Sequence, residues 1–305
     1  MYTFITNPNA RSGLGHKIWS QLEVILKNRS IPYEVHFTRY QRHATLLVRD
    51  ITSDLMEHIL VVLGGDGTIN EVVNGIADFS KVTLGYIPIG SSNDFARTFR
   101  LSSHPEKALD AILSPAEYSH VNIGTLSYQN KKKHFAVSTG IGFDAAVCHQ
   151  AVISKLKIFL NKIKLGKLTY AGIALDQLIY LSPGNMSLVL DGRQKISFDH
   201  VFFTAVLNHP YEGGGFKFCP DADPCDDVLN IIVVSSISKL KALLLLPTAF
   251  KGLHVHFKGV HTYTCKKAEI ESSKALPVHT DGEPIFLQRG ITVSLEPKKL
   301  RVITG

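Results

Sequence analysis

Three closely spaced glycines beside an aspartate, within residues 59–74, constrain this chain more than any other stretch. The apolar residues 59–63 come first and are typical of a buried strand in a parallel sheet. Gly64, Gly65 and Gly67 follow, and glycines let the backbone bring its N–H groups close to a ligand. Apolar residues then recur at helical spacing, which predicts a helix where the glycines end. A strand, a glycine loop and a helix N-terminus together form a common phosphate-binding arrangement.

Asp66 lies inside this loop, and its charge separates two interpretations. The simpler one is a tight strand-to-helix turn that binds no ligand. A carboxylate among backbone N–H groups, however, would repel phosphate unless a metal ion or a hydroxyl nucleophile stood between them. The loop is not a Walker loop, because G-x-x-x-x-G-K-[ST] occurs nowhere in the sequence. We therefore expect a site that handles phosphate and a metal ion together.

Strands and helices alternate over roughly the first 120 residues. The predicted elements are strands at residues 2–6, 33–38, 59–63 and 82–87, and helices at residues 14–28, 44–54 and, as helical turns, 95–113. This alternation predicts a parallel sheet with right-handed crossovers. Polar loops follow the first, third and fourth strands at residues 7–13, 64–70 and 90–94. The loops should meet at the carboxyl edge of the sheet, where open α/β sheets bind ligands.

The pattern changes after about residue 118. Further strands are predicted at residues 121–126, 134–138, 186–190, 201–207, 228–234, 255–265, 278–280, 285–287 and 291–295. Few helices separate the later strands, which predicts a second, mostly antiparallel β domain with helical insertions around residues 143–182. The predicted domains are an α/β domain at residues 1–120, a β domain at 121–297, and a segment at 298–305 that returns to the first domain.

Two acidic stretches lie in the second half. In T-D-G-E-P (residues 280–284), the D-G pair is typical of a hairpin turn. Asp281 and Glu283 would nevertheless project on one side of an extended backbone, and paired carboxylates can provide a general base. Residues 220–227 carry four aspartates. A solvated acidic loop is the ordinary interpretation, although such oxygen ligands also suit Mg²⁺.

Two further motifs have ordinary interpretations. Residues 140–145 match the dinucleotide fingerprint G-x-G-x-x-A, but they lie outside the alternating half, so we interpret them as a strand-to-helix turn. Residues 155–167 interleave lysines with aliphatic residues. They fit the solvated face of a core helix, and they also fit a basic amphipathic helix that lies on anionic lipid.

The composition predicts a cytoplasmic protein that is at most peripheral to a membrane. The four cysteines lack C-x-x-C spacing, which indicates reduced thiols without a metal. The N-terminus lacks a basic region with a long apolar core, and the longest apolar run, residues 242–246, is too short to cross a bilayer. The formal net charge of +7 is compatible with nucleic acid, an anionic membrane or a phosphorylated substrate.

Taken together and in order, five motifs resemble those of the bacterial diacylglycerol kinases, which are related to sphingosine and ceramide kinases and, more distantly, to NAD kinases. The motifs are N-P-N-A-R-S-G (7–13), G-G-D-G-T-I-N-E-V-V-N-G (64–75), P-I-G-S-S-N-D-F-A (88–96), G-I-G-F-D-A (140–145) and D-G-E-P (281–284). The resemblance implies an NAD-kinase-like α/β domain and a β-sandwich domain, with ATP between them. It further implies a lipid kinase that uses ATP and Mg²⁺, with diacylglycerol as the expected substrate.

The resemblance also implies roles for individual residues. Glu283 matches the general base of the family, with Asp281 close by, and Asp66 would lie at the phosphate and metal centre. The residues implied to contact ATP are Asn7, Thr38, Gly64, Gly65, Asp66, Gly67, Thr68, Asn70, Glu71 and Ser91. Ser91 stands where the family often has threonine, which keeps the hydroxyl group.

The resemblance implies a second Mg²⁺ position in the acidic loop. Asp226 matches the family's aspartate there, and main-chain oxygens near Asp223 and Val228 would assist it. The match is imperfect, because Asp227 stands where the family usually has glycine.

Two other functions stay open. NAD kinases share the G-G-D-G-T motif, but Asn70-Glu71 and D-G-E-P favour the lipid branch. A non-catalytic lipid-binding protein on the same fold is the second alternative, and the intact Asp66 and Glu283 count against it. The expected partners are ATP, a lipid with a free hydroxyl group and an anionic membrane surface, with no nucleic acid. Pairing of an edge strand would allow a homodimer.

Overall fold

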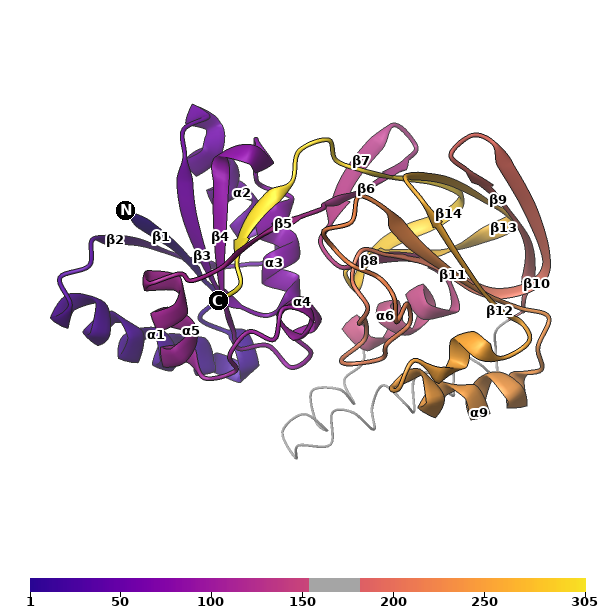
Figure 1. Cartoon of the computed structure of the whole chain (residues 1–305), viewed down its shortest axis with the longest axis horizontal. Coiled ribbons are helices and arrows are strands. Elements are labelled where there is room, and N and C mark those ends of the chain that lie inside the picture. Colours follow the sequence, from indigo (N-terminus) through magenta and orange to yellow (C-terminus); the bar gives the residue numbers. More distant parts are fainter. Residues whose placement is uncertain (154–181) are drawn as a thin grey trace.

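Two domains lie side by side in the computed structural model, which describes residues 1–153 and 182–305 (Figure 1). The first, drawn in indigo and purple, is an α/β domain, and the second is a mostly antiparallel β domain. This arrangement confirms the predicted fold class. Among the described residues, none of the helices combines the length and the apolar character that crossing a membrane requires. The lysine-rich stretch at residues 155–167 lies outside the described part of the chain.

The first domain contains a six-stranded sheet in the order β2-β1-β3-β4-β15-β5. Its strands are β1 (Tyr2–Thr6), β2 (Tyr33–Phe37), β3 (His58–Gly64), β4 (Val82–Pro88), β5 (Tyr118–Val121) and β15 (Leu300–Ile303). The strands β1 to β4 are parallel, because helices connect them over the faces of the sheet. The C-terminal strand β15 pairs parallel with β4, and β5 runs antiparallel to β15 at the edge.

Helices cover both faces of this sheet. They are α1 (Ala10–Asn28), α2 (His43–Ile51), α3 (Asp66–Val73), α4 (Asp94–Thr98) and α5 (Pro105–Leu113), with the short 3-10 helices η1 (Thr52–Asp54) and η2 (Phe79–Lys81). Alternate residues of β3 supply two separate apolar cores. Leu60 and Val62 pack with α2 and α3, whereas Val61 and Leu63 pack with α1 and α5. A strand buried on both faces needs this continuous apolar sequence.

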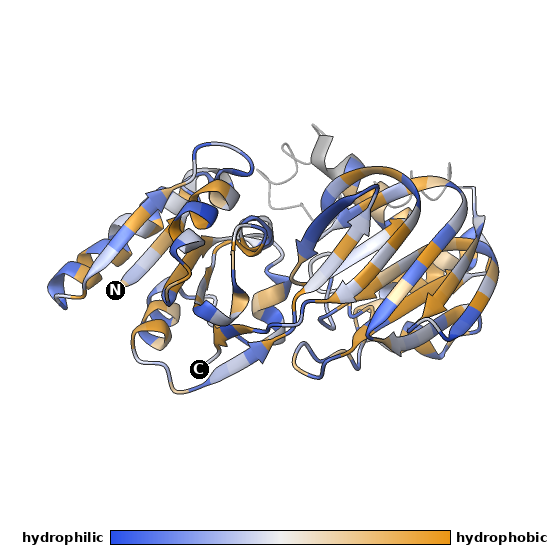
Figure 2. Cartoon of the chain, turned by 90° about the horizontal axis from the view of Figure 1, so that it is seen from above, coloured by the Kyte–Doolittle hydropathy of each residue, from blue (hydrophilic) through white to orange (hydrophobic). Residues whose placement is uncertain are grey.

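The second domain has a sheet in the order β12-β11-β10-β8-β13-β14-β6-β7, and β9 pairs with β10 and β13. Its elements are β6 (Gly124–Tyr128), β7 (Lys131–Phe135), β8 (Ser138–Gly142), α6 (Phe143–Ile153), β9 (Gly184–Leu190), β10 (Gln194–Leu207), β11 (Leu229–Ser235), α9 (Lys239–Ala249), η3 (Leu253–His256), β12 (Val260–Cys265), β13 (Lys267–Thr280) and β14 (Glu283–Leu295). Figure 2 shows hydrophobic and hydrophilic residues alternating along its long strands, as expected for a sheet with one buried face.

The structure corrects three details of the second half. The strand predicted at residues 255–265 begins only at Val260, because η3 occupies the residues before it. The three short strands predicted after residue 278 belong to the long hairpin of β13 and β14, whose register shifts at Leu276 hide the alternation. The helix α9 was not predicted, because its leucines form a continuous run without helical spacing. The available signal in the sequence was Ser238, which is the N-cap residue of the helix. Its hydroxyl group accepts the Lys241 N–H.

Candidate functional site

Three loops meet at the carboxyl edge of the first sheet, as the strand order predicts. The Asn7 N–H donates to the Leu63 carbonyl at 2.9 Å, and the Ile89 N–H donates to the Gly64 carbonyl at 2.8 Å. These bonds continue the pairing of β1, β3 and β4 into the loops. The Asn7 side chain also donates to the Thr68 hydroxyl at 3.4 Å. The first loop is thereby tied to the glycine loop.

A cavity of about 500 Å³ opens between these loops and the second domain. Of the predicted ATP-binding residues, those that line it are Asn7, Thr38, Gly65, Gly67, Thr68, Glu71 and Ser91. Glu283 is the lining residue from the second domain. Gly64, Asp66 and Asn70 do not line this cavity and lie behind it. The volume is within the usual range for a small-molecule site.

The glycines of the loop allow close contacts that side chains would block. A Cβ atom on Gly90 would lie 2.6 Å from the Cα atom of Gly65, so the second and third loops touch through glycine. A Cβ atom on Gly64 would lie 2.5 Å from the Thr68 hydroxyl oxygen. A Cβ atom on Gly67 would lie 3.6 Å from Oε1 of Glu283, so that carboxylate lies directly over the loop. The glycine loop therefore faces a carboxylate of the other domain.

Asp66 is the first residue of α3 and lies beside a second acid from the third loop. Its Oδ1 accepts the Phe95 N–H at 3.3 Å. Burial raises the pKa of Asp66 to about 7, and the nearby Asp94 carboxylate adds to the rise. Asp94 accepts the Gly214 N–H at 2.7 Å and is itself held at a raised pKa, chiefly by burial. Two repelling carboxylates beside the glycine loop fit a bound cation, which would relieve their repulsion.

Asp281 joins the two domains through four hydrogen bonds. Its Oδ2 accepts the side-chain amide of Asn70 and the Ala136 N–H, each at 2.8 Å. Its Oδ1 accepts the N–H groups of Val137 at 2.8 Å and Ser138 at 2.9 Å. Burial raises the pKa of Asp281, and these donors oppose the rise. A carboxylate has about four acceptor positions, and all are used here. These contacts favour a positioning role over proton transfer.

Glu71 also has structural partners. Its Oε1 accepts the Arg42 N–H at 2.8 Å, and its Oε2 accepts the Ala44 N–H at 3.1 Å. Both donors belong to the first turn of α2, where unpaired N–H groups need acceptors. Glu71 therefore fixes the start of α2 against α3, and its predicted contact with ATP stays a prediction.

Glu283 comes from a tight hairpin that the D-G pair predicts. Thr280 pairs with Glu283 across the turn, and the intervening Asp281 and Gly282 have φ angles of +48° and +79°. These values are those of a type I′ turn, in which Asp-Gly is favoured. The Glu283 carboxylate accepts the Gln41 side-chain amide at 2.9 Å. The carboxylate of this second-domain residue is thus held at the rim of the cavity by a residue of the first domain.

Lys133 is a basic residue near the site that the sequence reasoning missed. It lies in β7, where the neighbouring His134 N–H donates to the Asn74 side chain of α3 at 2.9 Å. Burial lowers the pKa of Lys133, while the carboxylates of Glu283 and Asp281 oppose that change. The sequence could have indicated Lys133 only by its position in a strand. Of the three consecutive lysines at 131–133, Lys131 and Lys132 are exposed, whereas Lys133 is half-buried.

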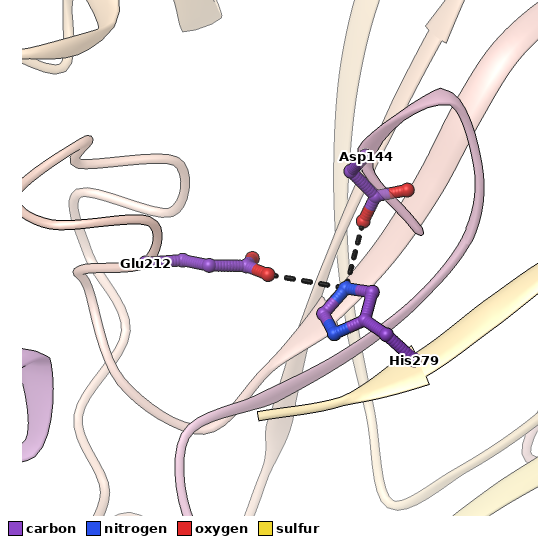
Figure 3. Close-up of side chains that lie close together, drawn as sticks. All are labelled: Asp144, Glu212 and His279. Atoms are coloured by element: carbon purple, nitrogen blue, oxygen red, sulfur yellow. Dashed lines mark hydrogen bonds and ion pairs between the residues drawn. The ribbon is translucent and has the colours of Figure 1, made fainter. Parts of the chain in front are cut away.

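A buried histidine lies between two carboxylates on the far side of the same hairpin (Figure 3). Nε2 of His279 is 3.1 Å from Oδ2 of Asp144 and 3.1 Å from Oε1 of Glu212. Such a set resembles a metal site. The Gly282 N–H, however, donates to Nδ1 of His279 at 3.1 Å, so Nδ1 is an acceptor and the ring proton is on Nε2. Nε2 then donates to the two carboxylates and is not free to bind a metal ion.

The predicted Mg²⁺ loop has an unusual backbone. Asp227 has a φ angle of +65°, a conformation that glycine adopts more readily than other residues. Oδ1 of Asp223 accepts the Cys225 N–H at 2.9 Å, and Oδ1 of Asp226 accepts the Val228 N–H at 3.1 Å. The loop therefore folds through bonds between its own aspartates and its own backbone.

A lysine supplies a cation to this loop. Nζ of Lys299 donates to the Cys225 carbonyl at 2.8 Å and lies 2.8 Å from Oδ1 of Asp227. The hydrogen bond from Lys299 is the main reason that the pKa of Asp227 is lowered. Asn122 also donates to Oδ1 of Asp227, at 3.0 Å. The ammonium group thus already offsets the charge of Asp227, for which a divalent ion is not required.

Comparison with known proteins agrees with the two domains. The family described as diacylglycerol kinase catalytic domain matches residues 1–125, and that described as YegS C-terminal NAD kinase beta sandwich-like domain matches residues 137–304. A Bacillus subtilis protein named "Putative lipid kinase YtlR" is 30% identical over 312 residues, which cover 99% of this chain and 98% of that protein. A Mycobacterium tuberculosis diacylglycerol kinase is 32% identical over 227 residues, which cover 73% of this chain and 70% of that protein.

Solved structures share the fold. A Bacillus anthracis structure described as "a putative diacylglycerol kinase" has a TM-score of 0.78 and 23% identity, and covers 99% of this chain and 96% of that chain. An NAD kinase from Archaeoglobus fulgidus in complex with ATP has a TM-score of 0.55 and 14% identity, and covers 99% and 93%.

We predict that Asp281→Asn lowers the free energy of unfolding by about 3 kcal/mol, because its amide group would face N–H donors in a buried site. Denaturant unfolding followed by circular dichroism measures this change. Glu283→Gln is the matched control and should change the free energy by less than about 1 kcal/mol, because Glu283 lies at the cavity rim. Equal effects of the two substitutions would contradict the positioning role of Asp281.

The raised pKa of Asp66 predicts a pH dependence of stability. In the folded protein the carboxyl group has a pKa of about 7 and keeps its proton up to that pH, whereas in the unfolded chain it loses the proton near its ordinary pKa of 3.8. The folded state therefore holds more protons between these values, and stability falls as pH rises through that window. Urea unfolding at several pH values should show a smaller fall for Asp66→Asn than for the unmodified protein. An unchanged fall would refute the assignment to Asp66.

The Lys299 contacts predict that chelation of divalent ions leaves the thermal midpoint of the unmodified protein unchanged. Lys299→Met should lower the midpoint, and added Mg²⁺ should restore part of the loss. Lys298→Met is the neighbouring control, because Lys298 pairs with Asp78 instead. Destabilisation of the unmodified protein by chelation would instead support Mg²⁺ at Asp226, Asp223 and the Val228 carbonyl.

Proposed function

The chain belongs to the diacylglycerol kinase catalytic domain family, and on this basis we propose that it is an ATP-dependent lipid kinase. It would transfer the γ-phosphoryl group of ATP to a lipid hydroxyl group, with diacylglycerol as the first candidate and phosphatidic acid as its product. The supporting observation is the position of Glu283, whose carboxylate lies over Gly67 of the glycine loop and at the rim of the cavity. One group that can accept a proton therefore faces the loop that would hold phosphate.

In the proposed reaction, Glu283 takes the proton of the lipid hydroxyl group as its oxygen attacks the γ-phosphorus. The bond from the phosphorus to the β,γ-bridging oxygen breaks, and ADP leaves. Backbone N–H groups of the glycine loop would stabilise the charge on the phosphoryl oxygens, which is the main source of catalysis in phosphoryl transfer. A bound Mg²⁺ would offset more of this charge, and Asp66 is the residue proposed to hold it. Asp281 and Gln41 hold Glu283 in place.

The nucleotide is proposed to occupy the 500 Å³ cavity. Asn7, Thr38, Thr68 and Ser91 offer amide and hydroxyl groups to ribose and phosphate, and Gly65 and Gly67 offer close backbone approach. Gly64, Asn70 and Glu71 would then act indirectly, because their contacts shape the loop, the domain interface and the start of α2. Lys133, which interacts electrostatically with the Glu283 carboxylate, would add positive charge on the side of Glu283.

NAD kinase activity is the nearest alternative, since an NAD kinase shares the fold. A non-catalytic lipid-binding protein is the second alternative. The Glu283 carboxylate at the cavity and the buried Asp66 carboxylate in the glycine loop favour an active kinase, and the relative named as a putative lipid kinase favours the lipid branch. The identity of the lipid is not fixed by the site, because diacylglycerol, sphingoid bases, ceramide and phosphatidylglycerol all offer a hydroxyl group. A cytoplasmic location and peripheral membrane contact are part of this proposal, and a homodimer is compatible with it.

An assay with γ-labelled ATP and Mg²⁺ tests the proposal. Diacylglycerol, ceramide, a sphingoid base and phosphatidylglycerol are offered in detergent micelles, and NAD is offered in solution. We expect label in one organic-extractable lipid and a loss of more than about a hundredfold in kcat for Glu283→Gln, the range of general-base catalysis. Asp66→Ala should lose activity as well.

Glu296→Gln is a control, because this acid contacts His134 and Thr125 away from the cavity. It should keep near-normal activity. Label only in NADP supports the NAD kinase alternative and rejects the lipid kinase. Binding of lipid with no transfer of label in any reaction supports the non-catalytic alternative.

A further inference from the structure

An exposed group of large apolar side chains lies on the second domain, and we call it the α9 patch. Its members are Leu240, Leu243 and Leu244 of α9 and, after it, Phe250, Leu253 and Phe257. Leu240 and Leu244 are each 67% exposed, although they are leucines in a folded helix. The three leucines are spaced three and four residues apart and so share one face of α9. Gathered apolar exposure of this kind marks an interaction site more often than a chance surface.

The patch is held in place by well-packed contacts beneath it. Leu245 and Ala249 on the opposite face of α9 are buried, and Leu245 joins an apolar cluster that includes Phe203 and Val260 of the sheet. Phe250 stacks on Phe216 with ring centres 4.1 Å apart. The exposed leucines therefore stand on a fixed helix, and their exposure does not result from a frayed end.

The segment that carries the patch is basic. Residues 228–268 contain no aspartate or glutamate but six lysines, namely Lys239, Lys241, Lys251, Lys258, Lys266 and Lys267. Lys251 and Lys258 are exposed and lie in sequence between or directly after the aromatic members of the patch. Exposed leucine and phenylalanine side chains beside lysines are typical of helices that lie in the interface of an anionic bilayer. An acidic protein partner would satisfy the lysines, but it would not need so many large apolar side chains.

Strand β8 connects the neighbourhood of the patch with the candidate site. Ser138, at the start of β8, donates to Asp281, and Phe143, directly after β8, packs in the same cluster as Ala242 of α9. A five-residue strand spans about 16 Å, which is less than the length of a lipid with its acyl chains extended. Figure 1 shows α6 and α9 along the same lower edge of the second domain.

We propose that the α9 patch is the surface by which this protein lies on an anionic membrane, with Leu240, Leu243 and Leu244 inserted among the acyl chains and Lys251 and Lys258 at the headgroups. The purpose of this membrane binding rests on the proposed lipid kinase function, because a lipid substrate could then enter the site without leaving the bilayer. The binding itself does not depend on catalysis. It can therefore be tested separately.

The test is co-sedimentation of the full-length protein with phosphatidylcholine vesicles, with and without phosphatidylglycerol and without any diacylglycerol. The unmodified protein should bind the anionic vesicles more tightly. Leu240→Asp with Leu244→Asp should lower the partition coefficient by more than about tenfold, because two apolar side chains lose their place in the bilayer. Lys251→Glu with Lys258→Glu should weaken binding to anionic vesicles more than binding to neutral ones, and added salt should have the same effect.

Leu46→Asp is the matched control, because Leu46 is a 49% exposed helical leucine of the first domain. It should bind vesicles as the unmodified protein does. Thermal unfolding verifies that all variants fold, and phosphorylation of a dispersed short-chain substrate verifies that the site is intact.

Unchanged vesicle binding by the double leucine variant overturns the proposal, as does a dimer in solution that the same variant abolishes. Kinase activity without vesicle binding rejects the membrane-binding role of the α9 patch but not the kinase proposal. Vesicle binding without kinase activity rejects the kinase proposal but not the role of the patch.

Discussion

The buried carboxylate of Asp281 is the contact on which the arrangement of the candidate site depends. It accepts three backbone N–H groups from residues 136–138 of the second domain and the Asn70 amide from α3 of the first. A carboxylate surrounded by donors is rigid, because any movement exposes a buried charge or leaves a donor without a partner. Asn70 follows the glycine loop by three residues, and Glu283 follows Asp281 by two. One carboxylate therefore fixes the distance between the loop and the proposed base.

The hairpin that carries Asp281 is braced from its other side by His279. The Gly282 N–H bond to Nδ1 closes the turn, and Nε2 then donates to Asp144 and Glu212. Nε2 of His279 lies near two carboxylates, as a metal ligand would, but it carries a proton and donates it to them. Its effect is mechanical, since the two carboxylates and the ring together limit the movement of the turn that holds Glu283. Residues that resemble a second metal centre thus stabilise the first site instead.

Local patterns in the sequence were sufficient to predict the parts of the site that depend on local structure. Residues 59–63 and the glycines after them predict the strand, loop and helix, and the D-G pair predicts the type I′ turn. Contacts between distant segments were not predictable in this way. The four partners of Asp281 come from residues 70 and 136–138, and no spacing rule relates them to residue 281. The helix α9 was missed for a different reason, because its exposed leucines violate the amphipathic pattern that normally identifies a helix.

The electrostatics of the site show why it would favour a metal–nucleotide complex. The Asp94 carboxylate repels that of Asp66, and the Glu212 carboxylate repels that of Asp94, so three acids from distant segments interact. Arg97, 3.6 Å from Asp94, offsets this charge only in part, since burial still raises the pKa of both aspartates. The free protein therefore carries repulsion that a cation at Asp66 would remove. Ligands that relieve such repulsion bind to the folded state alone and stabilise it by mass action. These acids would therefore favour the metal–nucleotide complex that we propose for the glycine loop.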